Sequence, residues 1–233
     1  MSNQQIVIYI EEDQLVAQKN NNYSLYLAKK VNDSFTVIWL SKLPFATLGQ
    51  PSYQYKNIFD MTNTSYMVNF TNTPLQEGDI NFTSGGKNLP IYTGQTTTLN
   101  KYGVFSPATN GSTSGVVSII NQLPANPREI LLDSTGRSLW VNCSGGMGIG
   151  TATMTPKNEF QLWFGAPQAN GSLIPGGLSN VYVATVNDGE SQTITFNNSG
   201  AWVPGEPAAR LTADEVMALN ARVNNVLAIG RKR

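Results

Sequence analysis

No histidine occurs in the 233 residues of this chain, and Cys143 is its single cysteine. Histidine is the commonest general acid or base near neutral pH and the commonest metal ligand in proteins. Its absence excludes a Ser-His-Asp triad, a Cys-His pair and any metal or haem site that depends on imidazole. One thiol is too few for a zinc or iron–sulfur site built from cysteines. We therefore expect neither a metal nor a cofactor.

Charge of either sign is scarce. Charged residues make up 13% of the chain, against about a quarter in an ordinary globular protein. The 15 basic and 15 acidic residues cancel, so there is no net field to attract nucleic acid, and we expect no nucleic-acid partner. Solubility then rests on neutral Asn, Thr, Ser and Gln. A net charge near zero also favours association between copies, so we expect a homo-oligomer.

Long apolar runs are also missing. No segment approaches the roughly 18 apolar residues of a membrane-spanning helix. The first residues contain neither the basic region nor the apolar core of a secretory signal. A lone Cys143 cannot form an internal disulfide, which is typical of a protein in a reducing compartment. We expect a cytoplasmic protein, or one that is released without a signal peptide.

Short β-branched and alternating runs are abundant, and Gly, Pro and Asn separate them every ten residues or so. This pattern is typical of a sandwich or barrel. It predicts strands at Gln5–Glu11, Ser24–Val31, Phe35–Ser41, Asn57–Met61, Ser65–Asn69, Asp79–Thr83, Leu89–Tyr92, Thr96–Leu99, Gly115–Ile120, Arg128–Leu132, Ser138–Cys143, Thr151–Thr155, Glu159–Phe164, Asn180–Val186 and Ser191–Phe196. The predicted fold is all-β: an antiparallel β-sandwich of the jelly-roll or Greek-key kind, or two packed sub-sandwiches, with one C-terminal α-helix.

Turn residues indicate how neighbouring strands pair. Asn32 and Asp33 tolerate the positive φ of a tight hairpin, and Gly136 and Gly189 supply it in two further turns. Strands joined by short turns pair antiparallel, so we expect antiparallel meanders or Greek keys. The β domain should span residues 1–205, with a candidate internal boundary near residues 123–128, where two prolines flank Ala-Asn.

One helix is predicted, at the C-terminal end. Thr212 and Glu215 form a capping box, and Val216, Leu219, Val223 and Val226 then fall on one face. Gly230 ends the helix, and the basic tail Arg231-Lys232-Arg233 follows, so residues 206–233 form a helical unit. Two roles fit this amphipathic face: docking on the β domain or association with a second copy.

The Gly-rich segment that follows Cys143 is expected to be a simple connection. A phosphate-binding loop needs a helix directly after it, whereas residues 151–155 read as a strand. Cys143 itself has no neighbouring histidine or lysine in sequence that would activate it. We expect a buried, inert thiol.

Aromatic side chains remain as the leading candidates for function. Trp39, Trp140 and Trp163 lie within predicted strands and should belong to the core. Trp202, Tyr53 and Tyr55 lie in loop-like contexts, near Asn57 and Asn198. Aromatic faces next to amide and hydroxyl groups suit a sugar ring or an exposed protein surface. The candidate ligand-binding residues are Trp202, Tyr53, Tyr55, Asn57 and Asn198, and the predicted function is non-enzymatic, lectin-like recognition of a glycan or other surface ligand.

Two alternatives stay open. The Ser/Thr-rich residues 96–122 resemble in composition the insertion hairpins of β-pore-forming toxins, and only this alternative implies a membrane partner. A cofactor-free enzyme could work with tyrosine or with a pair of carboxylates in a β-sandwich or barrel pocket. The candidate carboxylates are Glu11, Glu12, Asp13, Glu77, Asp79, Asp188, Glu190 and Glu206.

Overall fold

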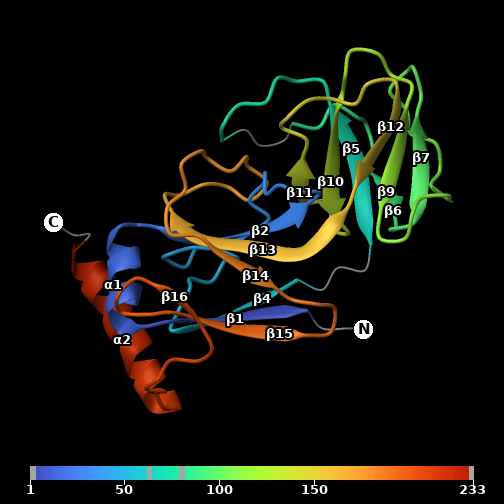
Figure 1. The fold of residues 1–233 in the computed structure, drawn as a ribbon. Helices are drawn as coiled ribbons and strands as arrows, with labels where there is room; N and C mark the ends of the chain where they lie inside the picture. Colours follow the sequence, from blue (N-terminus) through green and yellow to red (C-terminus); the bar gives the residue numbers. More distant parts are fainter. Residues whose placement is uncertain (1–3, 62–64, 79–81, 231–233) are drawn as a thin grey trace.

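The computed structural model of the chain describes residues 4–61, 65–78 and 82–230, with side chains described up to residue 223. Within these ranges the protein is mostly β, with four sheets of four strands each and two helices, one of them C-terminal (Figure 1). The elements are β1 (Gln5–Ile10), α1 (Glu12–Asn20), β2 (Ser24–Val31), β3 (Leu40–Lys42), β4 (Lys56–Asp60), β5 (Tyr66–Thr71), β6 (Leu89–Ile91), β7 (Gln95–Leu99), β8 (Thr109–Asn110), β9 (Val117–Asn121), β10 (Arg128–Asp133), β11 (Ser138–Val141), β12 (Gly150–Met154), β13 (Pro156–Gly165), β14 (Tyr182–Thr185), β15 (Ser191–Phe196), β16 (Trp202–Pro204) and α2 (Ala213–Gly230).

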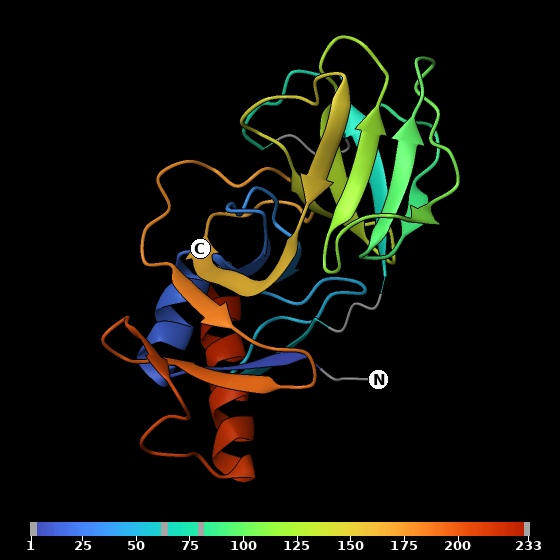
Figure 2. The same ribbon diagram turned by 45° about the vertical axis from the view of Figure 1, so that its right-hand side comes forward.

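The sheets divide into two groups that follow the chain. The β1 sheet has the order β16-β15-β1-β4 and the β13 sheet the order β14-β13-β2-β3. We call these two sheets and the helices the base. The β10 sheet (β11-β10-β5-β6) and the β9 sheet (β12-β9-β7-β8) use only strands β5 to β12, and we call them the insert. Figures 1 and 2 show the insert beside the base, with the helices at the far side of the base.

Most predicted strands are confirmed, because alternation and β-branched runs mark them clearly. The predicted bounds of β2 and β15 are those of the structure. The expected strand at residues 35–41 is reduced to β3, and residues 79–81 of another expected strand lie outside the described residues. The sequence prediction did not include the short strands β8 and β16.

The expectation that all strands pair antiparallel is wrong at two places. β1 pairs in parallel with β15, so that Gln5 opposes Ser191 and Ile10 opposes Phe196. β7 pairs in parallel with β9, with Thr96 opposite Ser118. Parallel pairing requires a long connection between the two strands, which turn residues cannot reveal. The predicted hairpin turns are confirmed at Asn32, whose φ is 54°, and at the turns that contain Gly136 and Gly189, both with positive φ.

Helix α1 is the largest element that the sequence did not predict. Its buried residues are Leu15 and Lys19, one turn apart, and it has no continuous apolar stripe. The helix is held by contacts from distant segments. The backbone N–H of Asp13 donates to Asn198 Oδ1 at 3.0 Å, and the Lys19 ammonium lies 5.1 Å from the centre of the Tyr53 ring.

Helix α2 confirms the predicted C-terminal helix. The capping box is formed: Glu215 Oε2 accepts from the Thr212 backbone N–H at 2.8 Å, and Thr212 Oγ1 accepts from the Glu215 N–H at 3.3 Å. Leu219 and Val223 are buried, so this face docks on the base. The helix extends to Gly230, the last residue that the structure describes. The side chain of Val226 and the basic tail 231–233 lie outside what the structure describes.

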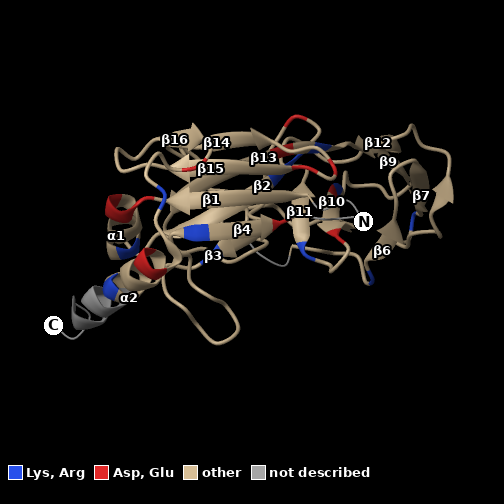
Figure 3. Ribbon diagram, turned by 90° about the horizontal axis from the view of Figure 1, so that it is seen from below, with Lys and Arg blue, Asp and Glu red and all other residues tan. Residues whose placement is uncertain are grey.

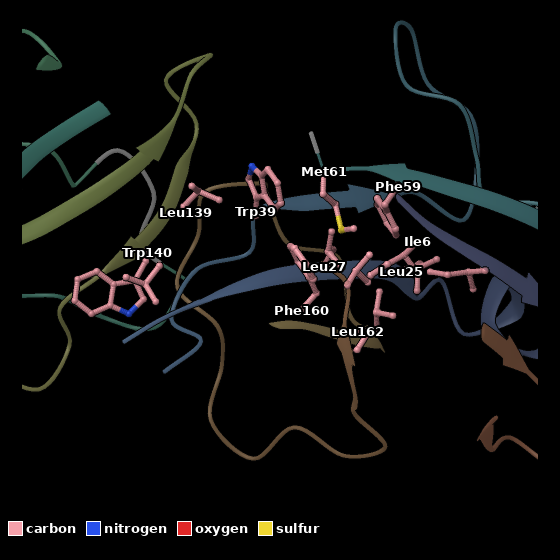
Figure 4. Packing of buried hydrophobic residues seen from close by; sticks show 14 of the residues in the cluster. Ile6, Leu25, Leu27, Trp39, Phe59, Met61, Leu139, Trp140, Phe160 and Leu162 are labelled. Carbon is pink, nitrogen blue, oxygen red and sulfur yellow. The ribbon is translucent and has the colours of Figure 1, made fainter. Parts of the chain in front are cut away.

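One hydrophobic core runs through base and insert. It joins residues such as Leu27 and Phe160 of the base to Leu139 and Trp140 of the insert (Figure 4). Burial of the three predicted core tryptophans is confirmed: Trp39, Trp140 and Trp163 are at most 3% exposed.

Hydrogen bonds also join the two parts. The Trp39 indole N–H donates to Asp133 Oδ2 at 2.9 Å, and that of Trp140 donates to Ser34 Oγ at 2.9 Å. Residues 34–39 therefore fasten the insert to the base.

Candidate functional site

An aromatic cleft lies where β13 ends and β2 begins. Gly165 closes β13 and pairs with Ser24 at the start of β2. The loop that follows β13 passes over this end of the sheet, and together they enclose a hollow of about 390 Å³. Its lining is Tyr23, Tyr26, Glu77, Trp163, Phe164, Gly165, Ala166, Gln168, Pro175, Gly177, Leu178 and Ser179. The cleft thus combines four aromatic residues with a carboxylate, an amide and a hydroxyl group.

The deepest part of the cleft is a fixed aromatic pair. Tyr26 and Trp163 are each 1% exposed, and their ring centres lie 5.4 Å apart. The Tyr26 hydroxyl donates to Ala166 O at 2.8 Å and accepts from the Gln168 backbone N–H at 2.6 Å. Burial raises the pKa of Tyr26, so its hydroxyl stays protonated at neutral pH. The hydroxyl therefore anchors the loop after β13 and keeps the cleft in shape.

One buried polar group in the cleft lacks a protein partner in the described part of the chain. The indole N–H groups of Trp39, Trp140 and Trp202 each donate to a protein acceptor. Trp163 lines the cleft and carries a further indole N–H. Gln168 Oε1 is a buried acceptor with no donor among the described residues. Buried polar groups are nearly always hydrogen-bonded, so a buried acceptor without a donor suits a ligand that offers a hydroxyl or N–H group.

The rim gives a ligand access to aromatic surface. Tyr23 is 37% exposed and Phe164 is half-buried. Glu77 is exposed, and it is the single carboxylate in the described lining of the cleft. An aromatic face with a polar group beside it can stack on an apolar ring face and bind the hydroxyls at the ring edge.

Phe164 connects the cleft to two of the predicted site residues. The Trp202 ring stacks on Phe164 with centres 5.8 Å apart and an angle of 15°, and Phe196 packs on the same ring at 5.1 Å. Tyr53 contacts Phe164 edge-on at 5.6 Å. Trp202 also donates its indole N–H to the backbone oxygen of Asn180, next to the cleft residue Ser179. Trp202 and Tyr53 thus support the cleft from behind and do not line it.

The expectation that Tyr53 and Tyr55 are loop aromatics open to a ligand is wrong. Tyr53 is fully buried and Tyr55 is 3% exposed. The Tyr53 hydroxyl donates to the backbone oxygen of Tyr23, and Tyr55 packs edge-on against Tyr9. Both rings follow an uncharged, proline-containing stretch that reads as a loop, yet they fill the core of the base.

The two predicted asparagines hold backbone in place. Asn57 is buried, its Nδ2 donates to Gln54 O at 2.6 Å, and its Oδ1 accepts from the Gln54 N–H at 2.9 Å. Asn198 is exposed, and besides its bond to Asp13 its backbone N–H donates to Glu11 Oε2 at 2.7 Å. Asn57 therefore closes a turn, and Asn198 caps the start of α1.

Cys143 is exposed, which corrects the expectation of a buried thiol. It lines a separate hollow of about 350 Å³ together with Asn142 and Trp140. Partial burial of the thiol raises its pKa, and the nearby Arg128 opposes this only in part. The thiol stays protonated at neutral pH, so the weak reactivity expected of it agrees with the structure. The segment after it leads into β12 and not into a helix, as predicted.

Among the described residues, no group of three or more Cys, Asp or Glu side chains could hold a metal ion. Of the candidate carboxylates, Glu77 lies at the cleft and Glu206 binds Arg210, whereas Asp79 is outside the described part. Neither described helix combines the length and apolarity of a membrane-spanning segment.

The sequence prediction missed the residues that form the cleft. Tyr23 follows α1, Glu77 lies in the loop after β5, and Gln168 lies in the loop after β13. The available signal was the run Trp163-Phe164-Gly165, because two aromatic residues directly before a glycine at a strand end can expose ring edges. No protein-family model, curated protein or solved structure matches the chain.

Proposed function

We propose that this protein is a non-enzymatic recognition protein that binds a neutral glycan in the aromatic cleft. The observation that carries the proposal is one aromatic hollow that includes an indole donor, Trp163 Nε1, together with a buried acceptor without a donor among the described residues, Gln168 Oε1. A sugar hydroxyl can accept from the first group and donate to the second. Tyr23 and Phe164 offer ring surface for the apolar face of the same sugar.

The size and charge of the cleft agree with this ligand class. A volume of about 390 Å³ lies within the ordinary range for small-molecule sites. Among the described lining residues Glu77 is the single carboxylate and none is basic, which favours a neutral ligand over an anionic one. Glycoside hydrolysis uses a pair of carboxylates, so this described lining favours binding without turnover.

The finer architecture and the setting are part of the proposal. We propose that the β10 and β9 sheets pack face to face as a sandwich, which is supported by the shared burial of Val68 and Leu131 with Val117 and Ile119 in one cluster. A self-associating protein, cytoplasmic or released without a signal peptide, fits the zero net charge of the sequence.

The test is titration with a panel of neutral oligosaccharides, followed by tryptophan fluorescence and calorimetry. Gly165→Ala adds a methyl group 3.4 Å from Trp163 Nε1, an ordinary contact that fills the cleft without straining the backbone. Tyr23→Ala removes the exposed ring. We expect each variant to weaken sugar binding by about tenfold or more.

Tyr92→Ala is the matched control, because Tyr92 is 56% exposed and lies on the insert, outside the cleft. It should bind as the unmodified protein does. The proposal fails if no sugar in the panel binds, or if Gly165→Ala and Tyr23→Ala bind as well as Tyr92→Ala. Cleavage of an oligosaccharide that depends on Glu77 would instead establish an enzyme.

A further inference from the structure

The insert has a very uneven charge pattern. Residues 82–127 contain Lys87 and Lys101 and no acidic residue, and residues 138–156 contain no charged residue at all. These ranges supply every strand of the β9 sheet. Figure 3 shows the result: the end of the molecule around β7, β9 and β12 is almost free of charged residues, whereas acidic and basic residues gather elsewhere. A soluble surface normally mixes both signs.

Large apolar side chains are exposed at one end of this sheet. Tyr102 is 77% exposed, Ile149 is 70% exposed and Val104 is 58% exposed. Ile120, on the neighbouring strand β9, is 39% exposed. Isolated exposed apolar residues are ordinary, but several at one end of an uncharged sheet mark a contact surface.

Hydrogen bonds bring these residues together and fix their exposure. In β7 and β12, Leu99 and Gly150 both stand beside Asn121 of β9, so the loops that carry Tyr102 and Ile149 leave the sheet at the same end. The Asn121 amide donates to the backbone oxygens of Met147 and Gly148.

The loop of residues 100–104 is itself a closed turn. Asn100 Oδ1 accepts from the backbone N–H groups of Tyr102 and Val104 at 2.9 and 3.1 Å. The turn therefore holds both side chains away from the core. We call Tyr102, Val104, Ile120 and Ile149 the apolar tip.

Both lysines of the insert's charge-poor stretch lie at the apolar tip. The Lys101 ammonium is 5.1 Å from the centre of the Tyr102 ring. Lys87 and Val104 line one hollow of about 310 Å³. A tyrosine and lysines beside exposed aliphatic groups match the interfacial region of a bilayer, where aromatic rings lie at the headgroups and lysines reach the phosphates.

We propose that the apolar tip docks on the surface of a lipid bilayer, with Val104 and Ile149 inserted among the headgroups and Lys87 and Lys101 at the phosphates. The purely cationic charge favours a bilayer over a protein partner, because membrane phosphates offer the opposite sign without a matched acidic patch. The apolar groups project from separate loops, which suits insertion better than a flat protein interface. This site lies on the β9 sheet and does not depend on the proposed glycan cleft.

The test is cosedimentation of the full chain with vesicles of phosphatidylcholine alone and of equal parts phosphatidylcholine and phosphatidylserine. We expect binding to both, tighter to the mixture. The double variant Val104→Ser with Ile149→Ser should weaken binding to both vesicles by more than about tenfold. Lys87→Gln with Lys101→Gln should lower binding to the mixed vesicles by about tenfold and remove most of their advantage.

The control is Val181→Ser with Val183→Ser. Val181 directly precedes β14 and is 43% exposed, and Val183 lies on β14 and is 47% exposed. It should bind both vesicles as the unmodified protein does. Failure of the unmodified chain to sediment with either vesicle overturns the proposal, as does equal loss of binding in the control pair. Concentration-dependent dimerisation that is lost in the double variant, without vesicle binding, would assign the tip to a second copy. All substituted residues are exposed, so circular dichroism should show folded variants.

Discussion

Replacing the buried lysine Lys29 with methionine should stabilise the protein at neutral pH. Lys29 lies on β2, is 3% exposed, and places its ammonium 4.5 Å from the centre of the Phe160 ring. Desolvation lowers its pKa from 10.5 to about 8, although the nearby Asp188 opposes the change. The folded protein thus carries an ammonium at pH 7 in a place that disfavours charge.

The magnitude follows from the pKa. A fall from 10.5 to about 8 means that charging this amine costs the folded state about 3 kcal/mol more than the unfolded chain. Contact with the Phe160 ring stabilises the charged amine by on the order of 1 kcal/mol. Methionine keeps the length of the apolar stem and removes the charge. We expect Lys29→Met to raise the free energy of unfolding at pH 7 by about 2 kcal/mol.

The sign of the pH dependence makes this prediction specific. Between about pH 8 and pH 10.5 the folded protein has released the Lys29 proton while the unfolded chain still holds it. The stability of the unmodified protein therefore rises with pH across this window, and the advantage of the variant shrinks by about 2 kcal/mol by pH 10.

Urea unfolding of both proteins at several pH values between 7 and 10 measures this difference. Lys30→Met is the control, since Lys30 forms a partly exposed ion pair with Glu159 at 2.8 Å. It should change stability by less than about 1 kcal/mol at every pH. A variant at Lys29 that is less stable at pH 7, or whose advantage does not change with pH, would refute the reasoning.

Two further substitutions test the supporting role of predicted site residues. Trp202→Ala removes a ring that stacks on Phe164 and packs at a tilt against Phe196, and it should destabilise the protein by about 3 kcal/mol in urea unfolding. Loss of sugar binding at unchanged stability would contradict this. Asn198→Ala removes the acceptor for the Asp13 N–H at the start of α1 and should lower the free energy of unfolding by about 1 kcal/mol. Asn198→Asp keeps an acceptor oxygen and should retain most of that stability. Equal losses of stability in the two variants would contradict the capping role.

Local pattern predicted the individual strands but not their partners. A few consecutive residues are enough to indicate strands β2 and β15 and the capping box at Thr212, so these predictions are confirmed. Helix α1 could not be predicted in this way, because its buried Lys19 depends on the Phe45 and Tyr53 rings, which follow β3 in the chain. The parallel partners of β1 and β7 are also set by the whole fold.

The cleft was unpredictable for the same reason. Its lining joins Tyr23, Glu77 and Trp163, which lie far apart in sequence. Tyr23 and Trp163 meet because β13 pairs with β2, and Glu77 comes from the loop after β5. Tyr53 looked exposed because its sequence neighbours are polar residues and a proline. Its ring is nevertheless fully buried and packs edge-on against Phe164 of β13. Sequence context near a residue therefore gave less information on burial than the partner strand did.

The placement of the insert between β4 and β13 sets an order for assembly during synthesis. The strands of the insert are contiguous and have all left the ribosome once β12 is complete. The base has to wait, because β1 gains its neighbour β15 only when residues 191–196 have been made. The first strand of the nascent chain therefore stays without its parallel partner through most of translation, and contacts of such long sequence separation form slowly. An arrested chain that stops after β12 would carry a completed insert and a β1 that has only β4 beside it, with its other edge open to aggregation.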